Sequence, residues 1–293
     1  MEIGRLGVWS FIDAWSAPDA AAFAKRVEEW GYSALWIPEA VGRNALVASS
    51  WLLANTSKLI IATGIANIYA RDPIAMAAAQ LSLAEQSGNR FLLGLGVSHA
   101  PLVEGLRGHA YSNKPVARMR DYLEGMKKLA YVAPRPTEVP KTVLAALGPK
   151  MIELGASDAD GIHPYNVTPR HTAKARALIG PGKWLCVEQA VILETDPERA
   201  RSIARSMLRT YLPLDNYRNN WVREGFSEED LAGEGSDRFI DEIIAWGDEA
   251  AIRARIQAHW DAGADHVCIQ ALNPDGSPQA DETALARLAP KSG

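Results

Sequence analysis

Eight short apolar segments recur along the chain, and amphipathic helical segments separate them. Parallel strands need a helical crossover at each step, so this alternation predicts a parallel sheet with helices packed around it. The predicted strands are Leu6–Trp9, Ala34–Ile37, Leu59–Thr63, Phe91–Leu95, Thr142–Ala146, Asp160–His163, Trp184–Leu193 and His266–Ala271. The predicted helices are Pro18–Trp30, Asn44–Asn55, Pro73–Gln86, Lys114–Tyr131, one that begins at Pro149, Pro169–Ile179, one from Pro197 to about Thr210, and Ala250–Ala262. Asp72 and Thr168 are predicted to cap two of them.

Eight strand–helix pairs in 293 residues favour a (β/α)8 TIM barrel, and we predict one such domain over residues 1–293. The main alternative is a doubly wound open sheet, which usually has fewer strands and a glycine fingerprint near its start; MEIGRLGVWSF lacks one. Two longer connections interrupt the repeat, at about 99–114 after the fourth strand and 213–248 after the seventh. Long connections at barrel strand ends usually form lids or binding loops. The acidic run Glu224–Glu234 is predicted to be a solvated face.

Composition narrows the class of partner. A net charge of -4 argues against nucleic acid or an anionic membrane as the main partner. No apolar run approaches the roughly 18 residues of a membrane-spanning helix, and no secretory signal is visible, so we expect a cytoplasmic protein. Cys186 and Cys268 sit in apolar runs and are predicted to be buried thiols. No clustered Cys/His set suggests a metal site.

Polar side chains follow several of the predicted strands. Ser98 and His99 end the segment RFLLGLGVSH, and Glu39, Asn67, His163 and Tyr165 follow three other strands. The carboxyl ends of parallel strands share one edge of the sheet, where ligands bind in α/β folds. His99 is an acid–base candidate because histidine titrates near neutral pH. Each residue alone is more often a plain loop residue, but their convergence on one mouth indicates a site.

The turn LGPKM joins the fifth predicted strand to a helix. Gly148 permits close approach, Pro149 begins the helix, and Lys150 adds positive charge. Free backbone amides at a helix start form an anion site, so one interpretation is phosphate binding. The other is an ordinary Gly-Pro helix start, which geometry alone favours because most helix starts bind nothing.

Six segments in register resemble the bacterial luciferase-like flavin superfamily: GVWSF, ALWIPEA, LIIATGIANIYARDP, RFLLGLGVSH, LAALGPKM and ADGIHPYNVTP. Within it the chain is most similar to deazaflavin-dependent oxidoreductases that use coenzyme F420. The resemblance covers nearly the whole chain and implies a TIM barrel with the cofactor ring at the carboxyl mouth. Flavin mononucleotide (FMN) relatives share this barrel.

The resemblance also implies which residues bind the cofactor. A bulge after strand three, often with a non-proline cis peptide, backs the ring and maps to Gly64–Ile65. The LGPKM turn matches the family's phosphate-binding helix start, and Asp160 and Gly161 lie where strand six passes the cofactor side chain. The implied cofactor-binding set is Gly64, Ile65, Ala66, Asn67, Val97, Ser98, Leu147, Gly148, Pro149, Lys150, Met151 and His163.

The sequence departs from the family pattern after strand two. Several relatives carry an acidic residue followed by His, whereas Glu39 is followed by Ala40. Relatives that act on sugar phosphates have Glu where this chain has His99, so that activity is not expected. A proton donor would then be His99, Glu39 or Tyr165.

The resulting hypothesis is an oxidoreductase that transfers hydride between coenzyme F420 and an unidentified small organic substrate. One alternative is an FMN-dependent luciferase-like monooxygenase, and another is a cofactor-binding protein without turnover. Relatives are often homodimers, and the oligomeric state of this chain stays open.

Overall fold

The computed structural model describes residues 1–290 and contains a closed barrel of eight parallel strands. The barrel strands are β1 (Leu6–Trp9), β2 (Ala34–Ile37), β3 (Ile60–Thr63), β5 (Phe91–Gly96), β6 (Thr142–Leu144), β7 (Gly161–Ile162), β8 (Trp184–Ile192) and β10 (His266–Ala271). They pair in chain order, and β10 closes the ring by pairing with both β8 and β1. The (β/α)8 barrel prediction is therefore confirmed, and the open-sheet alternative is wrong.

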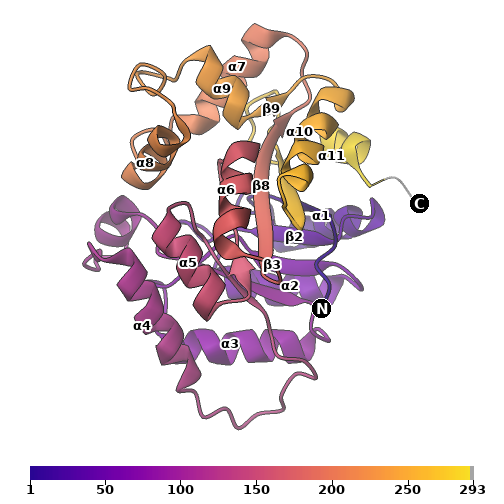
Figure 1. The fold of residues 1–293 in the computed structure, drawn as a ribbon. Helices are drawn as coiled ribbons and strands as arrows, with labels where there is room; N and C mark the ends of the chain where they lie inside the picture. Colours follow the sequence, from indigo (N-terminus) through magenta and orange to yellow (C-terminus); the bar gives the residue numbers. More distant parts are fainter. Residues whose placement is uncertain (291–293) are drawn as a thin grey trace.

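Helices surround the barrel, as Figure 1 shows. They are α1 (Ala17–Glu29), α2 (Ala45–Asn55), α3 (Pro73–Gln86), the π-helix η1 (Pro101–Leu106), α4 (Pro115–Lys127), α5 (Pro149–Asp158), α6 (Pro169–Ile179), α7 (Pro197–Leu208), α8 (Asp215–Glu224), α9 (Asp237–Ile243), α10 (Glu249–Asp261) and α11 (Glu282–Leu288). The two predicted caps are present: the Asp72 side chain accepts from two amides of α3, and that of Thr168 accepts from the amide of His171. Within residues 1–290, no helix has both the length and the apolar character needed to cross a membrane.

Two short strands lie outside the barrel ring. β4 (Ala66–Asn67) follows β3 and pairs with the end of β5, with Ala66 opposite Leu95. Between β3 and β4 the Gly64–Ile65 peptide bond is cis, as the family resemblance implies. β9 (Ala245–Trp246) pairs with the end of β8. Neither strand was predicted from the sequence, because two residues are too few for a periodic signal.

The barrel interior is filled by large side chains. Trp9 and Trp36 point inward and pack with Ala62, Cys186 and Cys268. Both cysteines are buried and free, as predicted. The two indoles therefore belong to the barrel interior, a placement that the sequence left open.

The connection between α7 and α10 forms its own small core. α7, α8 and α9 gather beyond the end of β8 (Figure 1) and enclose a second hydrophobic cluster that includes Trp221 and Phe239. The prediction of a solvated face at Glu224–Glu234 is wrong in part, because Glu224, Phe226 and Leu231 are buried. Phe226 and Leu231 belong to the second hydrophobic cluster, and Glu224 ends α8 and pairs with Lys174 of α6. Neither α8 nor α9 was predicted from the sequence.

Candidate functional site

The predicted site residues lie at the carboxyl ends of the barrel strands. Because all the barrel strands are parallel, the residues that follow β2, β3, β5, β6 and β7 share one rim. Gly148 and Lys150 are therefore on the same rim as Glu39 and Ser98. This arrangement places the predicted phosphate site and the predicted ring site around a single mouth.

The carboxylate of Glu39 connects several segments at this rim through hydrogen bonds and an ion pair. Oε2 accepts hydrogen bonds from the backbone amide of Asn67 at 2.9 Å and from Arg71 Nη1 at 3.0 Å, and Oε1 pairs with Arg71 Nη2. The backbone amide of Ala45, the first residue of α2, also reaches Oε1 at 3.4 Å. Only 4% of the Glu39 side chain and 11% of the Arg71 side chain are exposed. Both oxygens of Glu39 are thus occupied by partners that order the chain around β4.

The cis bulge is held by three hydrogen bonds, one from β1 and two from β2 and the residues that follow it. The Trp9 indole donates to the Gly64 carbonyl at 3.1 Å, the Gly64 amide donates to Ile37 at 2.8 Å, and the Glu39 amide donates to Ile65 at 3.2 Å. A Cβ at position 64 would lie 2.6 Å from Trp9 Nε1, so this position has no room for a side chain. Gly64 and Ile65 themselves are partly exposed, which leaves the bulge accessible from the mouth.

His163 lies beneath the bulge and is buried. Its Nδ1 bonds the carbonyl of Cys186 at 2.8 Å, and its ring stacks on Trp36 with centroids 4.3 Å apart. Burial lowers the pKa of His163 to about 4, so the ring is neutral at neutral pH. Its Nε2 has no partner among residues 1–290 and lies on the side that faces Gly64.

Aromatic side chains link the bulge to the far side of the mouth. The Tyr165 ring lies 5.1 Å from that of Trp9, and its hydroxyl donates to Gln270 Oε1 at 2.8 Å. Tyr217 of α8 lies 6.3 Å from Tyr165 and 5.7 Å from His99. Burial raises the pKa of Tyr165 and lowers the pKa of His99, which keeps both groups neutral near pH 7.

The start of α5 carries no side-chain cap. Gly148 is its N-cap residue, and no side chain accepts from the first amides of the helix. Arg223 of α8 approaches this turn: its Nη2 lies 3.5 Å from the place that a Cβ of residue 148 would take. Within residues 1–290, Arg223 makes no ion pair, and its guanidinium bonds only Asn220 Oδ1, at 3.4 Å. Pro149 has no N–H, and the Met151 amide donates to the Gly148 carbonyl at 3.1 Å, so within the first helical turn the amide of Lys150 is the free one. The turn combines this amide with a guanidinium that has no carboxylate partner among residues 1–290.

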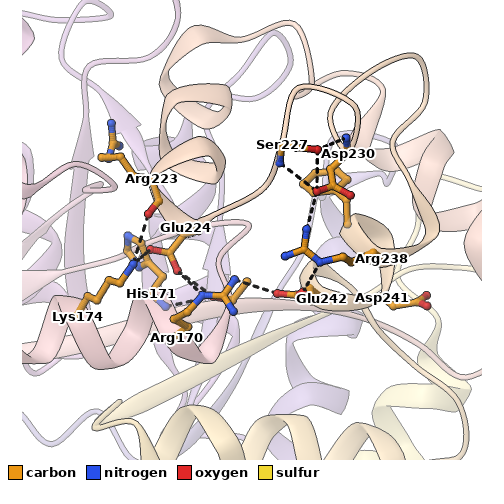
Figure 2. A network of polar contacts seen from close by, with 12 residues as sticks. Arg170, His171, Lys174, Arg223, Glu224, Ser227, Asp230, Arg238, Asp241 and Glu242 are labelled. Atoms are coloured by element: carbon orange, nitrogen blue, oxygen red, sulfur yellow. Dashed lines mark hydrogen bonds and ion pairs between the residues drawn. The ribbon is translucent and has the colours of Figure 1, made fainter.

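A polar network fixes α8 beside this turn (Figure 2). Glu224 is buried and accepts from Lys174 Nζ at 3.0 Å, and it pairs with Arg170 Nε at 3.5 Å. Arg170 also bonds Glu242 of α9 at 2.9 Å. Because α6 holds both α8 and α9, the position of Arg223 is set by its neighbour Glu224.

Several residues of the mouth were not predicted as site residues from the sequence: Trp9, Glu188, Tyr211, Tyr217, Arg223 and Gln270. Glu188 could have been found from the sequence, because an acidic residue inside the apolar strand WLCVEQAVIL is unusual and indicates a functional position. Its side chain is buried, Oε2 accepts from the Asn166 amide at 3.0 Å, and Oε1 has no partner among residues 1–290. Burial raises the pKa of Glu188 to about 8.

The chain is similar in sequence and in fold to several known proteins. A Mycobacterium tuberculosis protein named as a coenzyme F420-dependent oxidoreductase is 28% identical over 202 residues, which cover 58% of this chain and 57% of that protein. The chain thus spans less than two thirds of this curated relative. An F420-dependent secondary alcohol dehydrogenase in complex with an F420-acetone adduct superposes with a TM-score of 0.78 at 14% identity, covering 99% of this chain and 97% of its own.

An FMN-bound structure is also similar. The oxygenating constituent of 3,6-diketocamphane monooxygenase from Pseudomonas putida, in complex with FMN, has a TM-score of 0.70 at 13% identity and covers 98% of this chain and 96% of its own. At such identities the likeness of the two solved structures shows the shared barrel fold. The sequence profile of the luciferase-like monooxygenase family matches residues 5–266, from β1 to the start of β10. The chain therefore belongs to the luciferase-like monooxygenase family.

Proposed function

We propose that this protein is an oxidoreductase that transfers hydride between coenzyme F420 and a small organic substrate. The observation that carries the proposal is the joint presence, on one rim, of the uncapped α5 start and the accessible Gly64–Ile65 bulge. The relatives named for F420 support the choice of cofactor, and the FMN-bound relative keeps FMN as the competing candidate.

The α5 turn fits a phosphorylated cofactor. The amide of Lys150, next to the N-cap residue Gly148, and the charges of Lys150 and Arg223 would bind a phosphate, while Leu147, Pro149 and Met151 shape the turn around it. Since Arg223 makes no ion pair within residues 1–290, binding an anion there breaks no existing pair.

The bulge fits a flat ring. Gly64 and Ile65 would back the ring, and Ala66, Asn67, Val97, Ser98 and His163 would surround it from β4, the end of β5 and the end of β7. When bound, the deazaflavin supplies the carbon that accepts or donates hydride. The chain binds and orients both reactants and excludes water.

Proton transfer would fall to His99 or Tyr165. His99 is partly exposed at the mouth, and its lowered pKa makes it a base near pH 7. Tyr165 is a neutral donor beside Trp9. Glu39 would act by positioning the bulge, because both of its oxygens are engaged with backbone amides and Arg71.

The test is a fluorescence titration of the purified protein with F420 and with FMN. We expect saturable binding of F420, and then reduction of at least one carbonyl or enone compound from a panel by reduced F420. Binding of FMN with oxygen consumption would favour the monooxygenase instead. Tight F420 binding without turnover would favour a binding protein, and binding of neither cofactor would refute the proposal. Full turnover by His99→Ala would remove His99 from the mechanism.

A further inference from the structure

A cavity of about 460 Å³ lies at the carboxyl rim between α7 and the chain that follows β1 and β10. Trp9, Ser10 and Phe11 line one side, and Ser206 and Met207 of α7 line another. Connection 271–280, which follows Gln270, closes the third side. In the barrel order, β6 is four strands away from β1, so this cavity lies across the mouth from the α5 start.

The side chain of Trp9 connects the cavity to the bulge. Trp9 lines the cavity, and its Nε1 donates to the Gly64 carbonyl. A molecule in the cavity would therefore be separated from the bulge by the indole of Trp9. The volume is sufficient for a small organic molecule of one or two rings.

The lining is uncharged apart from one residue. Among the residues that line the cavity there is no Lys, Arg or His, and Asp275 is the single acid. The remaining side chains are apolar, as Phe11 and Leu272 are, or polar and neutral. An anionic group placed here would lose its water without gaining a positive partner, which disfavours carboxylate or phosphate substrates.

One buried polar group is aimed into this space. Gln270 is 6% exposed and lines the cavity, and its Oε1 accepts from the Tyr165 hydroxyl at 2.8 Å. Tyr165 is held in turn by the Tyr211 hydroxyl at 3.0 Å. These bonds orient the amide of Gln270, whose Nε2 makes no hydrogen bond to another residue among 1–290 and is accessible from the cavity. An oriented amide N–H that faces the cavity and has no protein acceptor can donate to a ligand with an acceptor oxygen.

We propose that this cavity binds the substrate, and that it selects an uncharged, largely apolar molecule whose acceptor oxygen bonds the amide of Gln270. The proposal rests on the proposed function for the chemistry that follows, but binding in the cavity is independent of it. In this proposal, the connections after β1 and β10, together with α7, determine which substrates the protein accepts.

A matched pair of probes tests whether the cavity prefers an uncharged molecule to an anion. 2-Acetylnaphthalene is a neutral ketone, and 2-naphthoate is an anion of similar size. Calorimetric titration of the protein, without cofactor and with F420, should show the ketone binding at least tenfold more tightly. Equal binding of the two probes, or binding of neither, would overturn the proposal.

Two substitutions locate the binding. Ser206→Trp on α7 would fill the cavity and should weaken ketone binding at least tenfold, whereas Ser82→Trp, on an exposed face of α3, should leave it unchanged. Gln270→Leu should weaken ketone binding while circular dichroism shows an intact fold. If F420 binds all variants normally and Ser206→Trp has no effect, the cavity proposal fails and the proposed function stands. If the unmodified protein does not bind F420 but the ketone still binds in the cavity, only the proposed function is refuted.

Discussion

Trp9 and Gly64 are joined by a hydrogen bond of 3.1 Å from the indole nitrogen to the carbonyl oxygen. This bond connects β1 to the cis bulge, although the two residues are 55 positions apart in the chain. The same indole lines the neighbouring cavity, so it separates the bulge from the space beside it. Trp9 thus couples two parts of the mouth.

Replacing Trp9 with Phe should loosen the bulge. The change leaves the Gly64 carbonyl without its donor, which costs on the order of 1 kcal/mol. We expect a similar loss of unfolding free energy and about fivefold weaker F420 binding. Trp260→Phe is the matched control, because its indole also donates to a backbone carbonyl, that of Arg5 at 3.2 Å, away from the mouth. Equal effects of both variants on F420 affinity would contradict a special role for Trp9.

Glu39→Gln should destabilise the protein by about 3 kcal/mol, because it leaves Arg71 buried without a counter-charge. Arg71→Met should cost a similar amount for the opposite reason. In the double variant the two losses should not add, since each breaks the same pair. Urea unfolding of the three variants measures this coupling. Strict additivity would show that the two side chains do not act together.

Gly148→Asp tests the phosphate site with little structural cost. The residue has φ -87°, and its nearest neighbour beyond the helix, Arg223, is at ordinary contact distance, so a side chain fits. Asp is a good N-cap residue and should preserve stability. Its negative charge should weaken F420 binding at least about tenfold. Gly148→Asn, an equally good cap without charge, should bind nearly normally; matching losses in both variants would implicate sterics instead.

Glu188 should make stability fall as pH rises. Burial raises its pKa from 4.5 to about 8, so between these values the folded protein holds a proton that the unfolded chain has released. The contribution of Glu188 to the free energy of unfolding therefore decreases by up to about 1.4 kcal/mol per pH unit across that window. Buried neutral histidines such as His163 contribute a slope of opposite sign below pH 6.5, so the Glu188 slope is read as the difference between the unmodified protein and its Glu188 variant. Glu188→Gln should remove this slope in urea unfolding from about pH 5 to pH 8, while the exposed Glu153→Gln should retain it. An unchanged slope in Glu188→Gln would show that the group ionises freely.

Much of the barrel could be predicted from the sequence because its strands are continuous apolar runs between helices with strong caps. β1, β2 and β10 have the predicted bounds, and α3 begins after Asp72 as expected. α8 was missed because its sequence DNYRNNWVRE is mostly polar. Its helical signal consists of Tyr217 and Trp221, one turn apart.

The mouth was predictable only where its residues follow strands. Glu39 and Ser98 stand at strand ends, which places them on the rim by topology alone. Gln270 and Glu188 lie within strands, and an apolar strand does not reveal which of its faces meets the barrel interior. Arg223 reaches Gly148 across 75 positions through the ion pairs of Glu224, a contact that no local pattern encodes.

The carboxylate of Glu39 ties the first turn of α2, β4 and Arg71 into one rigid node. The outer surface of the barrel is thereby mechanically connected to its mouth. A substitution that shifts α2 by a fraction of an ångström would tilt the bulge without touching it. Substitutions in α2 can therefore change the position of the bulge that would contact the ring, without any substitution in the mouth itself.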